Sequence, residues 1–546
     1  MQHCYSINLS TTYSAIERPK YSNSIEPYKD FYKLFSHINM ANIKSIFSYS
    51  DIKKHPISIT QATLLILYLF ISSANAMTGN HNIDCNSDIV HCVSNISDNP
   101  QEFNKIQDAV LIAQPGDKVI VFNGTYDGFQ IGVDQHGSYI NGKPDQRITI
   151  KAVDEAVIIN TPYIEKTRNL RKIKSRACGI TVLFGGDNWT IDGFKINLAS
   201  KATISSAGNN PHNPNAASQI GNHNGFHSAG ICTDGHLAIS NHINGLEIIN
   251  NSIENGGDAG IIISHCENCL FENNTISGTY RARTLNKNGH GIYLANSGSD
   301  NSVIKYNTIF QNDGHGIHIN GDSSSGGDGI ITNVLIDGNT IYKNGLIPAD
   351  SNGGIGINMD GVQDSTIINN LAYGNYDSTV KAYKVDGREA PKNLRIINNT
   401  FISNQWAIHL VNNRYSKDLG GHVIFNNILL GDSKRQGSIS LSDTDIRSNY
   451  NILSNGFSLS GSYKKTESLY SWKKAIRQDT NSYMSFDGLF ENPAIGNYKP
   501  KRSISIINRG TALFSNTHAP KTDINRDKRN KLLPISIGAY TSHSSN

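Results

Sequence analysis

Apolar and polar residues alternate in a short phrase that recurs along most of the chain. The phrase is a β-branched segment followed by one or two Asn, one further residue and an apolar residue, as in GLEIINNSI, CLFENNTI, SVIKYNTI, NVLIDGNTI, STIINNLA, LRIINNTF and HVIFNNIL. Its Asn positions lie 23, 33, 32, 31, 29 and 28 residues apart, at Asn251, Asn274, Asn307, Asn339, Asn370, Asn399 and Asn427. Alternation with period two indicates half-buried strands, and a near-constant repeat indicates a solenoid.

A second alternating phrase lies between these Asn positions, in the forms AGIII, HGIYL, HGIHI, GGIGI, KAYKV and WAIHL. One coil of such strands cannot bury its apolar face alone, so successive coils are expected to stack around a continuous core. Stacked strands lie about 4.8 Å apart, which would align the recurring Asn residues as a ladder. Each side-chain amide would then bond the next coil and a turn, where Asn tolerates left-handed geometry.

The repeats and both ends of the chain resemble right-handed parallel β-helix proteins of the pectin-lyase-like superfamily. The segment FNKIQDAVLIAQPGDKVIVFNGTY (103–126) resembles their amphipathic capping helix and first strand. The segments SISIINRG (503–510), TDINRDKR (522–529) and ISIGAY (535–540) resemble their closing coil. The resemblance implies an all-β chain: a single-stranded right-handed parallel β-helix, or solenoid, with an N-terminal capping helix. It is specific for the fold and not for the reaction, because this scaffold hosts many chemistries.

The strongly apolar run ISITQATLLILYLFISSANA (57–76) follows Lys53 and Lys54 and ends in Ala74-Asn75-Ala76. This layout predicts a secretory signal cleaved after Ala76, with an apolar centre short for a span of about 20 residues. The predicted organisation is a leader (1–76), an N-terminal segment (77–99) and the β-helix with its closing coil (100–545). The protein is then secreted or periplasmic, without a stable membrane span; the alternative is an uncleaved N-terminal anchor. Met40 is an alternative start.

Charge and composition narrow the classes of partner. Charged residues make up 17% of the chain and Gly numbers 48, unlike a helical protein. The formal charge is +4 for the whole chain, but the chain after Ala76 has 42 basic and 41 acidic residues, so its charge is +1. A nearly neutral chain gives no reason to expect nucleic acid as a partner. A monomer is expected.

Six of the seven cysteines follow Ala76, an even number that suits disulfides in an exported chain. Cys85 and Cys92 are the expected pair, closing a small loop before the repeats. Cys266 and Cys269 have the CxxC spacing of zinc or redox sites. Without a second CxxC or a nearby His pair, a structural role is expected for them.

The candidate site lies on the outward side of the second phrase. Because Ile292 and Leu294 must enter the core, Tyr293 is expected to face solvent. Aligning the coils on this phrase predicts one outward column of Cys232, Ile262, Tyr293, His318, Gly356, Lys384 and His409. A second predicted column contains His290, His315, Gly353, Lys381 and Trp406. The two glycines would leave a gap for an elongated polysaccharide along the helix axis.

These columns favour a lyase or C5-epimerase acting on an acidic polysaccharide. Both reactions remove the C5 proton of a uronate, which needs a base, an acid and a group that neutralises the carboxylate. The assigned roles are His318 or Lys384 as base, Tyr293 as acid and Arg283 as neutraliser, because Arg283 suits a bidentate contact to a carboxylate. The residues assigned to substrate binding are His290, His315, Lys381, Trp406 and His409.

Two other functions fit the same sequence. A glycoside hydrolase needs two carboxylates roughly 5–10 Å apart, and the aligned columns contain no such pair. A non-catalytic carbohydrate-binding or surface protein would show the same Asn-rich coils.

The sequence does not specify a metal cofactor. Ca²⁺ is a candidate through Asp258, Asp313 and Asp328, although no acidic cluster marks a site. The Gly-His-Gly phrase resembles a polygalacturonase motif, but that family's Asn-Thr-Asp, Asp-Asp and Arg-Ile-Lys segments do not occur here.

Overall fold

The computed structural model describes residues 83–85, 87–95, 102–134, 136, 138–153, 157–161, 177–183, 185–198, 228–233, 242–257, 259–279, 289–345, 353–410, 420–432, 436–442, 445–459, 468–529 and 534–541. The chain divides into two units, Met1–Ile83 and Asp84–Asn546. The expected leader (1–76) with its signal lies outside the described residues. No described helix has the length and apolarity needed to cross a membrane.

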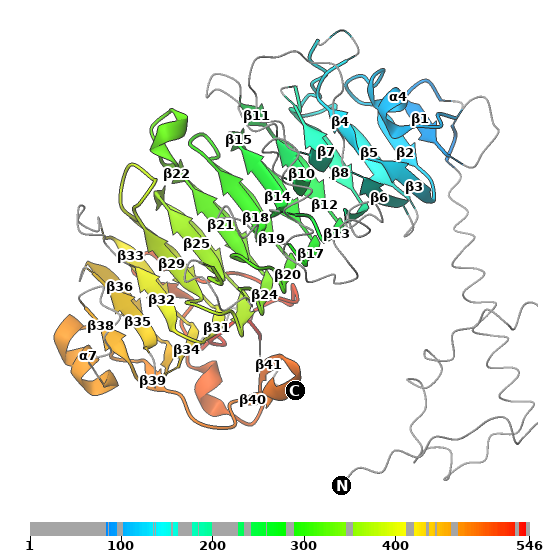
Figure 1. Cartoon of the computed structure of the whole chain (residues 1–546). Coiled ribbons are helices and arrows are strands. Elements are labelled where there is room, and N and C mark those ends of the chain that lie inside the picture. The colour runs from blue at the N-terminus through cyan, green and yellow to red at the C-terminus, as the bar shows by residue number, and fades with distance from the viewer. Residues whose placement is uncertain are drawn as a thin grey trace, which may run out of the picture. The chain divides into compact units, whose positions relative to one another are not determined.

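Three long parallel β-sheets, named sheets A, B and C, run side by side through the second unit (Figure 1). Each coil contributes one strand to each sheet, so neighbouring strands within a sheet come from successive coils. Within the described residues, sheets A and B each have 12 strands and sheet C has 11. The predicted solenoid of stacked parallel strands is confirmed.

Sheet A consists of β1 (Val90–Val93), β2 (Lys118–Val121), β5 (Ile148–Ala152), β8 (Trp189–Asp192), β12 (Glu247–Ile249), β16 (Leu270–Glu272), β19 (Val303–Lys305), β23 (Leu335–Asp337), β27 (Thr366–Ile368), β30 (Arg395–Ile397), β33 (His422–Phe425) and β36 (Ile446–Asn449). Sheet B consists of β3 (Gly124–Asp127), β6 (Val157–Thr161), β9 (Lys195–Asn197), β13 (Ser252–Glu254), β17 (Thr275–Ser277), β20 (Thr308–Phe310), β24 (Thr340–Tyr342), β28 (Leu371–Tyr373), β31 (Thr400–Ser403), β34 (Ile428–Gly431), β37 (Ile452–Leu453) and β39 (Tyr483–Met484).

Sheet C consists of β4 (Phe129–Ile131), β7 (Ala177–Val182), β10 (Ser228–Thr233), β14 (Ala259–Ser264), β18 (His290–Ala295), β21 (Ile317–Asn320), β25 (Ile357–Asp360), β29 (Val380–Tyr383), β32 (Trp406–Leu410), β35 (Gly437–Leu441) and β38 (Phe457–Ser458). Short pairs are β11 (Ile243–Asn244) with β15 (Cys266–Glu267), β22 (Ile331–Thr332) with β26 (Val362–Gln363), β40 (Phe490–Asn492) with β41 (Asn497–Pro500), and β42 (Leu513–Phe514) with β43 (Thr517–His518). The helices are α4 (Ile106–Val110) and α7 (Leu469–Ile476), with 3-10 turns η2 (Ser323–Ser325), η3 (Pro493–Ile495) and η4 (Ser505–Asn508).

The interior is a column of aliphatic side chains, one from most strands of sheets A and B. In sheet B, for example, Ile253, Ile276, Ile309 and Ile341 lie directly above one another in register and are fully buried. Each such side chain contributes about 1.5–3 kcal/mol through its burial. Coil stacking, rather than any single strand pair, therefore holds the fold together.

The predicted Asn ladder is present and lies inside the protein. The backbone N–H and the Nδ2 of Asn307 both donate to Asn339 Oδ1, each at 2.9 Å, and Asn307 Nδ2 also donates to Phe271 O at 2.9 Å. The same pattern links all neighbouring pairs of the series Asn251, Asn274, Asn307, Asn339, Asn370, Asn399, Asn427 and Asn451. These amides satisfy one another and the turn backbone, which is why buried polar residues are tolerated here.

The left-handed turn geometry belongs to the residue before each ladder Asn, not to the ladder Asn itself. These preceding residues have φ between 54° and 67°, at Asn250, Asn273, Tyr306, Gly338, Asn369, Asn398, Asn426 and Tyr450. The expectation that the ladder Asn adopts this conformation is wrong. The Asn-Asn pairs in the sequence therefore combine two roles, a left-handed turn residue followed by a ladder amide.

The ladder ends at a buried carboxylate. Asn451 Nδ2 donates to Asp479 Oδ1 at 3.2 Å, and its backbone N–H donates to Ser482 Oγ, which itself donates to Asp479 Oδ1 at 2.6 Å. The Trp472 indole donates to Asp479 Oδ2 at 3.0 Å. Trp472 belongs to α7 and stacks on Phe457 of β38 with ring centroids 5.0 Å apart. Helix α7 therefore covers the C-terminal end of the described stack.

The N-terminal part of the stack begins earlier than expected. Strand β1 pairs in parallel with β2, with Val90 opposite Lys118, so a strand precedes the segment 103–126 that was expected to begin the β-helix. Within that segment, α4 buries Ile106, Ala109 and Val110 against the core. A capping role for this short helix stays a prediction.

The C-terminal segment packs along the turns between sheets A and B. Asn426 Nδ2 donates to Thr511 O at 2.7 Å, and Asn398 Nδ2 donates to Ser536 O at 2.8 Å. Further back along the stack, Arg529 Nη2 donates to Asn369 Oδ1 at 2.9 Å. The segment expected to form a closing coil thus lies lengthwise over several coils.

Three disulfides join the cysteines that follow Ala76: Cys85–Cys92, Cys178–Cys232 and Cys266–Cys269. Cys178 and Cys232 lie on neighbouring strands β7 and β10, on the outward side of sheet C. Cys266 and Cys269 lie in the turn that leads from sheet C to sheet A, and both are buried. The CxxC spacing is therefore structural.

Candidate functional site

The outward side of sheet C carries most of the candidate residues. On β18, Ile292 and Leu294 are fully buried in the core and Tyr293 between them is half-buried on the outward side. Strand pairing continues this position from coil to coil as the outward column, which contains Thr181, Cys232, Ile262, Tyr293, His318, Asn358, Lys381, His409, Ser440 and Ser458. The predicted neighbours Tyr293 and His318 are thus paired directly.

Two members of the predicted outward column are wrong. Asn358 stands where Gly356 was expected, and Lys381 stands where Lys384 was expected. In the second predicted column, pairing places Ile355 in place of Gly353 and Ser378 in place of Lys381. The expected glycine gap is therefore absent from the outward column, and Lys384 follows the end of β29.

The glycine that precedes each core Ile explains both the motif and the misalignment. A Cβ on Gly291 or Gly316 would strike the Cγ2 of a core isoleucine of sheet B, so this position faces inward and must be small. Because Gly291 and Ile292 both face inward, the residues on either side of them, His290 and Tyr293, face outward on the same side of the sheet. In GGIGINMD, Gly356 takes this inward position, which the predicted alignment had given to Gly354. In the next coil Thr379 takes it, which moves Lys381 into the outward column.

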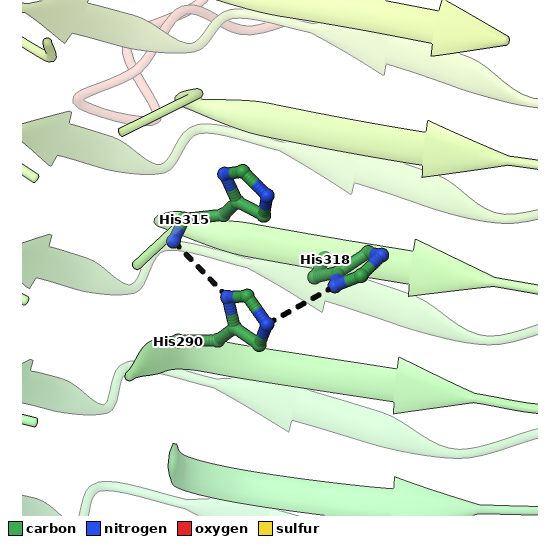
Figure 2. A group of neighbouring side chains, drawn as sticks. All are labelled: His290, His315 and His318. Carbon is green, nitrogen blue, oxygen red and sulfur yellow. Dashed lines mark hydrogen bonds between the residues drawn. The ribbon is translucent and has the colours of Figure 1, made fainter. Parts of the chain in front are cut away.

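Three histidines and one tyrosine form a compact group, named the His–Tyr cluster: His290, Tyr293, His315 and His318. The rings of Tyr293 and His318 stack at 4.5 Å with an interplanar angle of 5°. The rings of His290 and His315 stack at 4.9 Å with an angle of 10°. His318 lies edge-on to His290, as Figure 2 shows, and their ring centroids are 4.7 Å apart.

Hydrogen bonds fix the protonation of these rings. The His315 backbone N–H donates to His290 Nδ1 at 3.1 Å, and the Ile355 backbone N–H donates to His315 Nδ1 at 3.2 Å. Both Nδ1 atoms are therefore acceptors, and the neutral rings hold their proton on Nε2. His290 Nε2 lies 3.3 Å from His318 Nδ1 (Figure 2), so it donates there and leaves the His318 proton on Nε2.

This bonding keeps His318 neutral. Accepting a second proton would place an N–H on His318 Nδ1, directly opposite the N–H of His290. Burial and the neighbouring His290 both lower the pKa of His318 well below its usual value. His318 therefore suits the role of a neutral hydrogen-bond donor through Nε2 better than the predicted role of general base.

Stability is expected to fall on acidification because buried histidines are held neutral. Burial, aided by the Lys381 charge, lowers the pKa of His409 to about 3. The unfolded chain binds protons below about pH 6.5, so stability is complete above that pH and falls as the pH drops toward 3. The slope is up to about 1.4 kcal/mol per pH unit for each histidine. Urea unfolding at pH 7 and pH 5 should show a smaller pH dependence for His409→Gln than for the parent. An equal pH dependence would refute this assignment.

The His–Tyr cluster also includes the one group of three metal-ligand side chains among the described residues. One ring nitrogen each of His290, His315 and His318 lies within 4.8 Å of the other two. Such a set suits zinc or copper rather than Ca²⁺, which takes oxygen ligands. The backbone N–H groups, however, occupy the Nδ1 lone pairs of His290 and His315 and leave their Nε2 protonated. The cluster as folded does not fit a metal ion.

The coils after His318 add a cation, an amide and a phenol to the outward side. Asn358 Nδ2 donates to Tyr383 Oη at 2.9 Å, and Lys381 Nζ lies 5.9 Å from the centroid of the Tyr383 ring. Asp360 lies on β25, as Asn358 does, and is buried. It accepts hydrogen bonds from the backbone N–H groups of Val385, Asp386 and Gly387 at 2.7–3.1 Å. Asp360 therefore fixes the turn after β29 rather than serving as a catalytic carboxylate.

Comparisons with known proteins agree with this architecture. A family model described as "Right handed beta helix region" matches residues 169–345. The chain is a right-handed parallel β-helix. No curated protein matches it in sequence.

Solved structures similar to this β-helix include pectate lyase Pel9A, with 12% identity, a TM-score of 0.45 and coverage of 83% of this chain and 96% of that one. The complex of XylC with xylose has 12% identity, a TM-score of 0.42 and coverage of 83% and 98%. The A-module of mannuronan C-5 epimerase AlgE4 from Azotobacter vinelandii has 12% identity, a TM-score of 0.34 and coverage of 70% and 94%.

Further along the β-helix, Trp406 and His409 of β32 are fully buried. Their rings are parallel, with centroids 6.2 Å apart. Neither presents a surface to a ligand in this conformation, so their assigned contact with substrate stays a prediction. Several buried polar atoms on this side lack a hydrogen-bond partner: Asn358 Oδ1, Trp406 Nε1, Gln436 Oε1 and Ser440 Oγ. Each such atom costs about 1–3 kcal/mol.

The remaining candidates divide into those outside the described structure and those the sequence did not suggest. Arg283 and Asp258 lie outside the described residues. The prediction missed Asn320, whose Nδ2 donates to Tyr293 Oη at 3.3 Å. It also missed Tyr383. The sequence could have indicated both residues, because alternate residues of a strand face the same side. Asn320 follows His318 by two residues, and Tyr383 follows Lys381 by two.

Proposed function

We propose that this β-helix binds an acidic polysaccharide along the outward side of sheet C and cleaves it by β-elimination at a uronate. The stacked pair Tyr293 and His318 carries the proposal. It combines a phenol that can transfer a proton with a fixed neutral donor next to it. The secreted or periplasmic location remains part of this proposal.

Neutralising the uronate carboxylate makes the C5 proton more acidic. In the proposed complex, His318 Nε2–H donates to this carboxylate, and the Lys381 ammonium supplies positive charge from the same column. Lys381 thus replaces Lys384, which lies off the column. Arg283, shortly before His290 in the sequence, is proposed as a further cation.

Tyr293 is assigned the proton transfer. As phenolate it takes the C5 proton; the bond from C4 to O4 breaks, a C4–C5 double bond forms, and the phenol returns the proton to O4. The amide of Asn320 donates to the same oxygen and so favours its negative charge. Proton transfer from one side of the sugar suits elimination better than epimerisation, which needs transfer on both sides of the ring.

The alternative of a glycoside hydrolase has less support. The described strands of sheet C contain one acidic residue, Asp360, and its carboxylate accepts hydrogen bonds from three backbone N–H groups. A hydrolase needs a second carboxylate and a free first one. Non-catalytic carbohydrate binding remains the outcome if no reaction is detected.

Incubation with alginate, pectate and glycosaminoglycans tests the proposal. β-Elimination is expected to increase ultraviolet absorbance, from the new double bond, in step with new reducing ends. Reducing ends without absorbance would instead indicate hydrolysis. Neither signal, together with unchanged uronate stereochemistry by NMR, would reject an enzymatic function on these polymers.

A further inference from the structure

A hollow opens where the C-terminal segment crosses the turns between sheets A and B, and we name it the C-terminal hollow. Its volume is about 570 Å³, within the range of pockets that hold small ligands. Tyr450, from a turn of the stack, forms one wall, and the C-terminal segment forms the rest with Ser505, Arg509, Gly510 and Thr511 among its lining residues. None of the described lining residues belongs to sheet C, so the hollow is separate from the His–Tyr cluster.

Hydrogen bonds between the segment and the stack hold the walls in place. Asn426 Nδ2 donates to Thr511 O at 2.7 Å, and the Thr511 backbone N–H donates to Asn426 Oδ1 at 3.0 Å. The backbone N–H of Gly510 donates to Ile535 O at 2.9 Å. The hollow is therefore formed before any ligand arrives, which lowers the entropy that binding would cost.

Tyr450 occupies a turn position that asparagine or glycine takes in most coils. Among the eight left-handed residues that precede the ladder amides, the tyrosines are Tyr306 and Tyr450, each with a φ of 56°. This conformation is unfavourable for a bulky side chain and is tolerated by asparagine and glycine. The turn itself therefore does not require a tyrosine, and the ring at each position needs a reason of its own.

The contacts of the two rings differ. Arg526 of the C-terminal segment lies 4.0 Å from the centroid of the Tyr306 ring and covers its face. Tyr450 instead meets Phe514 in an edge-to-face contact, with ring centroids 6.0 Å apart. Among the described residues, no cation and no parallel ring covers Tyr450. Its ring is half-buried and lines the hollow, so it offers an aromatic surface to a ligand there.

Arg509 gives the hollow a positive charge. It is exposed, its guanidinium lies 6.0 Å from the centroid of the Tyr483 ring, and it pairs with no carboxylate of the described residues. Arg526 in the same segment, by contrast, lies 3.4 Å from Glu272. The described lining of the hollow contains no acidic residue. A bound anion would therefore meet a cation without an opposing negative charge.

These groups together limit the ligand. A guanidinium binds a carboxylate through two parallel hydrogen bonds, an aromatic ring packs against apolar C–H surface, and the Ser505 hydroxyl both donates and accepts. A sugar that carries a carboxylate would use all three groups. A neutral sugar would leave the guanidinium unused, and a small inorganic anion would leave the ring uncovered.

We propose that the C-terminal hollow is a second, non-catalytic binding site for one uronate unit of a glycan. Arg509 binds the carboxylate and Tyr450 packs against the sugar ring. The proposal rests on the proposed function for the view that this glycan is the polymer cleaved on sheet C. The hollow would then hold part of the polymer away from the reacting unit.

The test measures binding by calorimetry to the full chain carrying His318→Gln and Lys381→Gln, which removes the carboxylate contacts assigned on sheet C. The probes are the methyl glycosides of glucuronic, galacturonic and mannuronic acid. At least one is expected to bind, about tenfold or more tightly than its neutral hexose counterpart. Adding Arg509→Gln should weaken binding about ten- to hundredfold. Arg502→Gln is the control for charge, because Arg502 is exposed in the same segment but outside the lining.

Tyr450→Asn tests the ring without disturbing the turn, because asparagine is the usual residue at this position. It should keep Tm near that of the parent and weaken the same probe about three- to tenfold. If the chain with both sheet C substitutions does not fold, the same titrations use the parent, in which Arg509→Gln should remove one binding event and Arg502→Gln none.

The site is overturned if no uronate glycoside binds, if Arg509→Gln or Tyr450→Asn binds like its parent, or if acetate binds as tightly as the uronate. Binding in the hollow without elimination activity on any polysaccharide would reject the proposed function and keep the site. Elimination activity without binding in the hollow would do the reverse.

Discussion

Tyr293→Phe is expected to lower kcat on the cleaved polysaccharide by about 10²–10⁴-fold, the usual contribution of a positioned proton-transfer group. The substitution removes one oxygen and keeps the ring that stacks on His318 at 4.5 Å. KM should change little, because the carboxylate contacts assigned to His318 and Lys381 remain. The measurement is initial-rate kinetics by ultraviolet absorbance on the purified full chain.

The matched control is Tyr342→Phe. Tyr342 lies in a similar stack on sheet B, 4.9 Å from Phe310 and 5.0 Å from Tyr373, away from the outward side of sheet C. It should keep the parent rate, which separates loss of the phenol in the His–Tyr cluster from loss of any stacked phenol. Full activity of Tyr293→Phe would remove Tyr293 from the mechanism.

Arg529→Met is expected to lower the free energy of unfolding by about 3–5 kcal/mol, the range for breaking a buried charged network. Arg529 is 5% exposed and donates to Asn369 Oδ1, Ser536 O and Gly538 O at 2.9–3.2 Å. Burial lowers its pKa to about 10, so it remains charged at neutral pH. The variant removes the donor to Asn369 Oδ1, leaves Ser536 O and Gly538 O with the Asn398 amide as donor, and weakens the attachment of the C-terminal segment to the turns.

Arg526→Met is the comparison within the same segment. The Arg526 side chain is 58% exposed, 3.4 Å from Glu272 and 4.0 Å above the Tyr306 ring. Exposed contacts of this kind contribute up to about 1 kcal/mol. Urea unfolding should therefore separate the two variants by at least 2 kcal/mol. Equal midpoints would show that the segment is not held by Arg529.

The repeated phrases were sufficient to predict the coils, because each records a physical requirement that recurs. An aliphatic residue fills the column between strands, and an amide continues the ladder from Asn251 to Asn427. The same spacing also marks a second series that the prediction missed, Asn312, Asn344 and Asn375, whose amides bond one another in the turn after sheet B. The periodicity of the sequence was therefore enough to predict most of the fold.

Register on sheet C was harder to predict because the sequence offers two solutions. Gly-Ile occurs twice in GGIGINMD, and only the contact of Gly356 with the neighbouring coil selects the second. In the following coil Thr379 and Ala382 replace the usual Gly and Ile, so Lys381 and Lys384 both fit an alternating pattern. Which lysine faces outward depends on Val380 and Ala382 filling the core.

Contacts between distant parts of the chain were beyond prediction. Arg529 forms a hydrogen bond with Asn369, 160 residues earlier in the chain, and no repeat or motif in the sequence predicts this contact. The protonation of the histidines depends on backbone N–H groups of other coils, as in the bond from Ile355 to His315 Nδ1. The sequence suggested the residue types of the site, whereas their roles follow from these bonds.

The Asn ladder also has a polarity. Every amide from Asn251 onward accepts from the coil before it and donates to the coil after it, so the side-chain dipoles point head to tail along the axis. Such an array is electropositive where its last hydrogens emerge, as a helix is at its N-terminus. Those hydrogens meet the carboxylate of Asp479, a counter-charge that completes the row and explains why a buried acid stands where the amides stop.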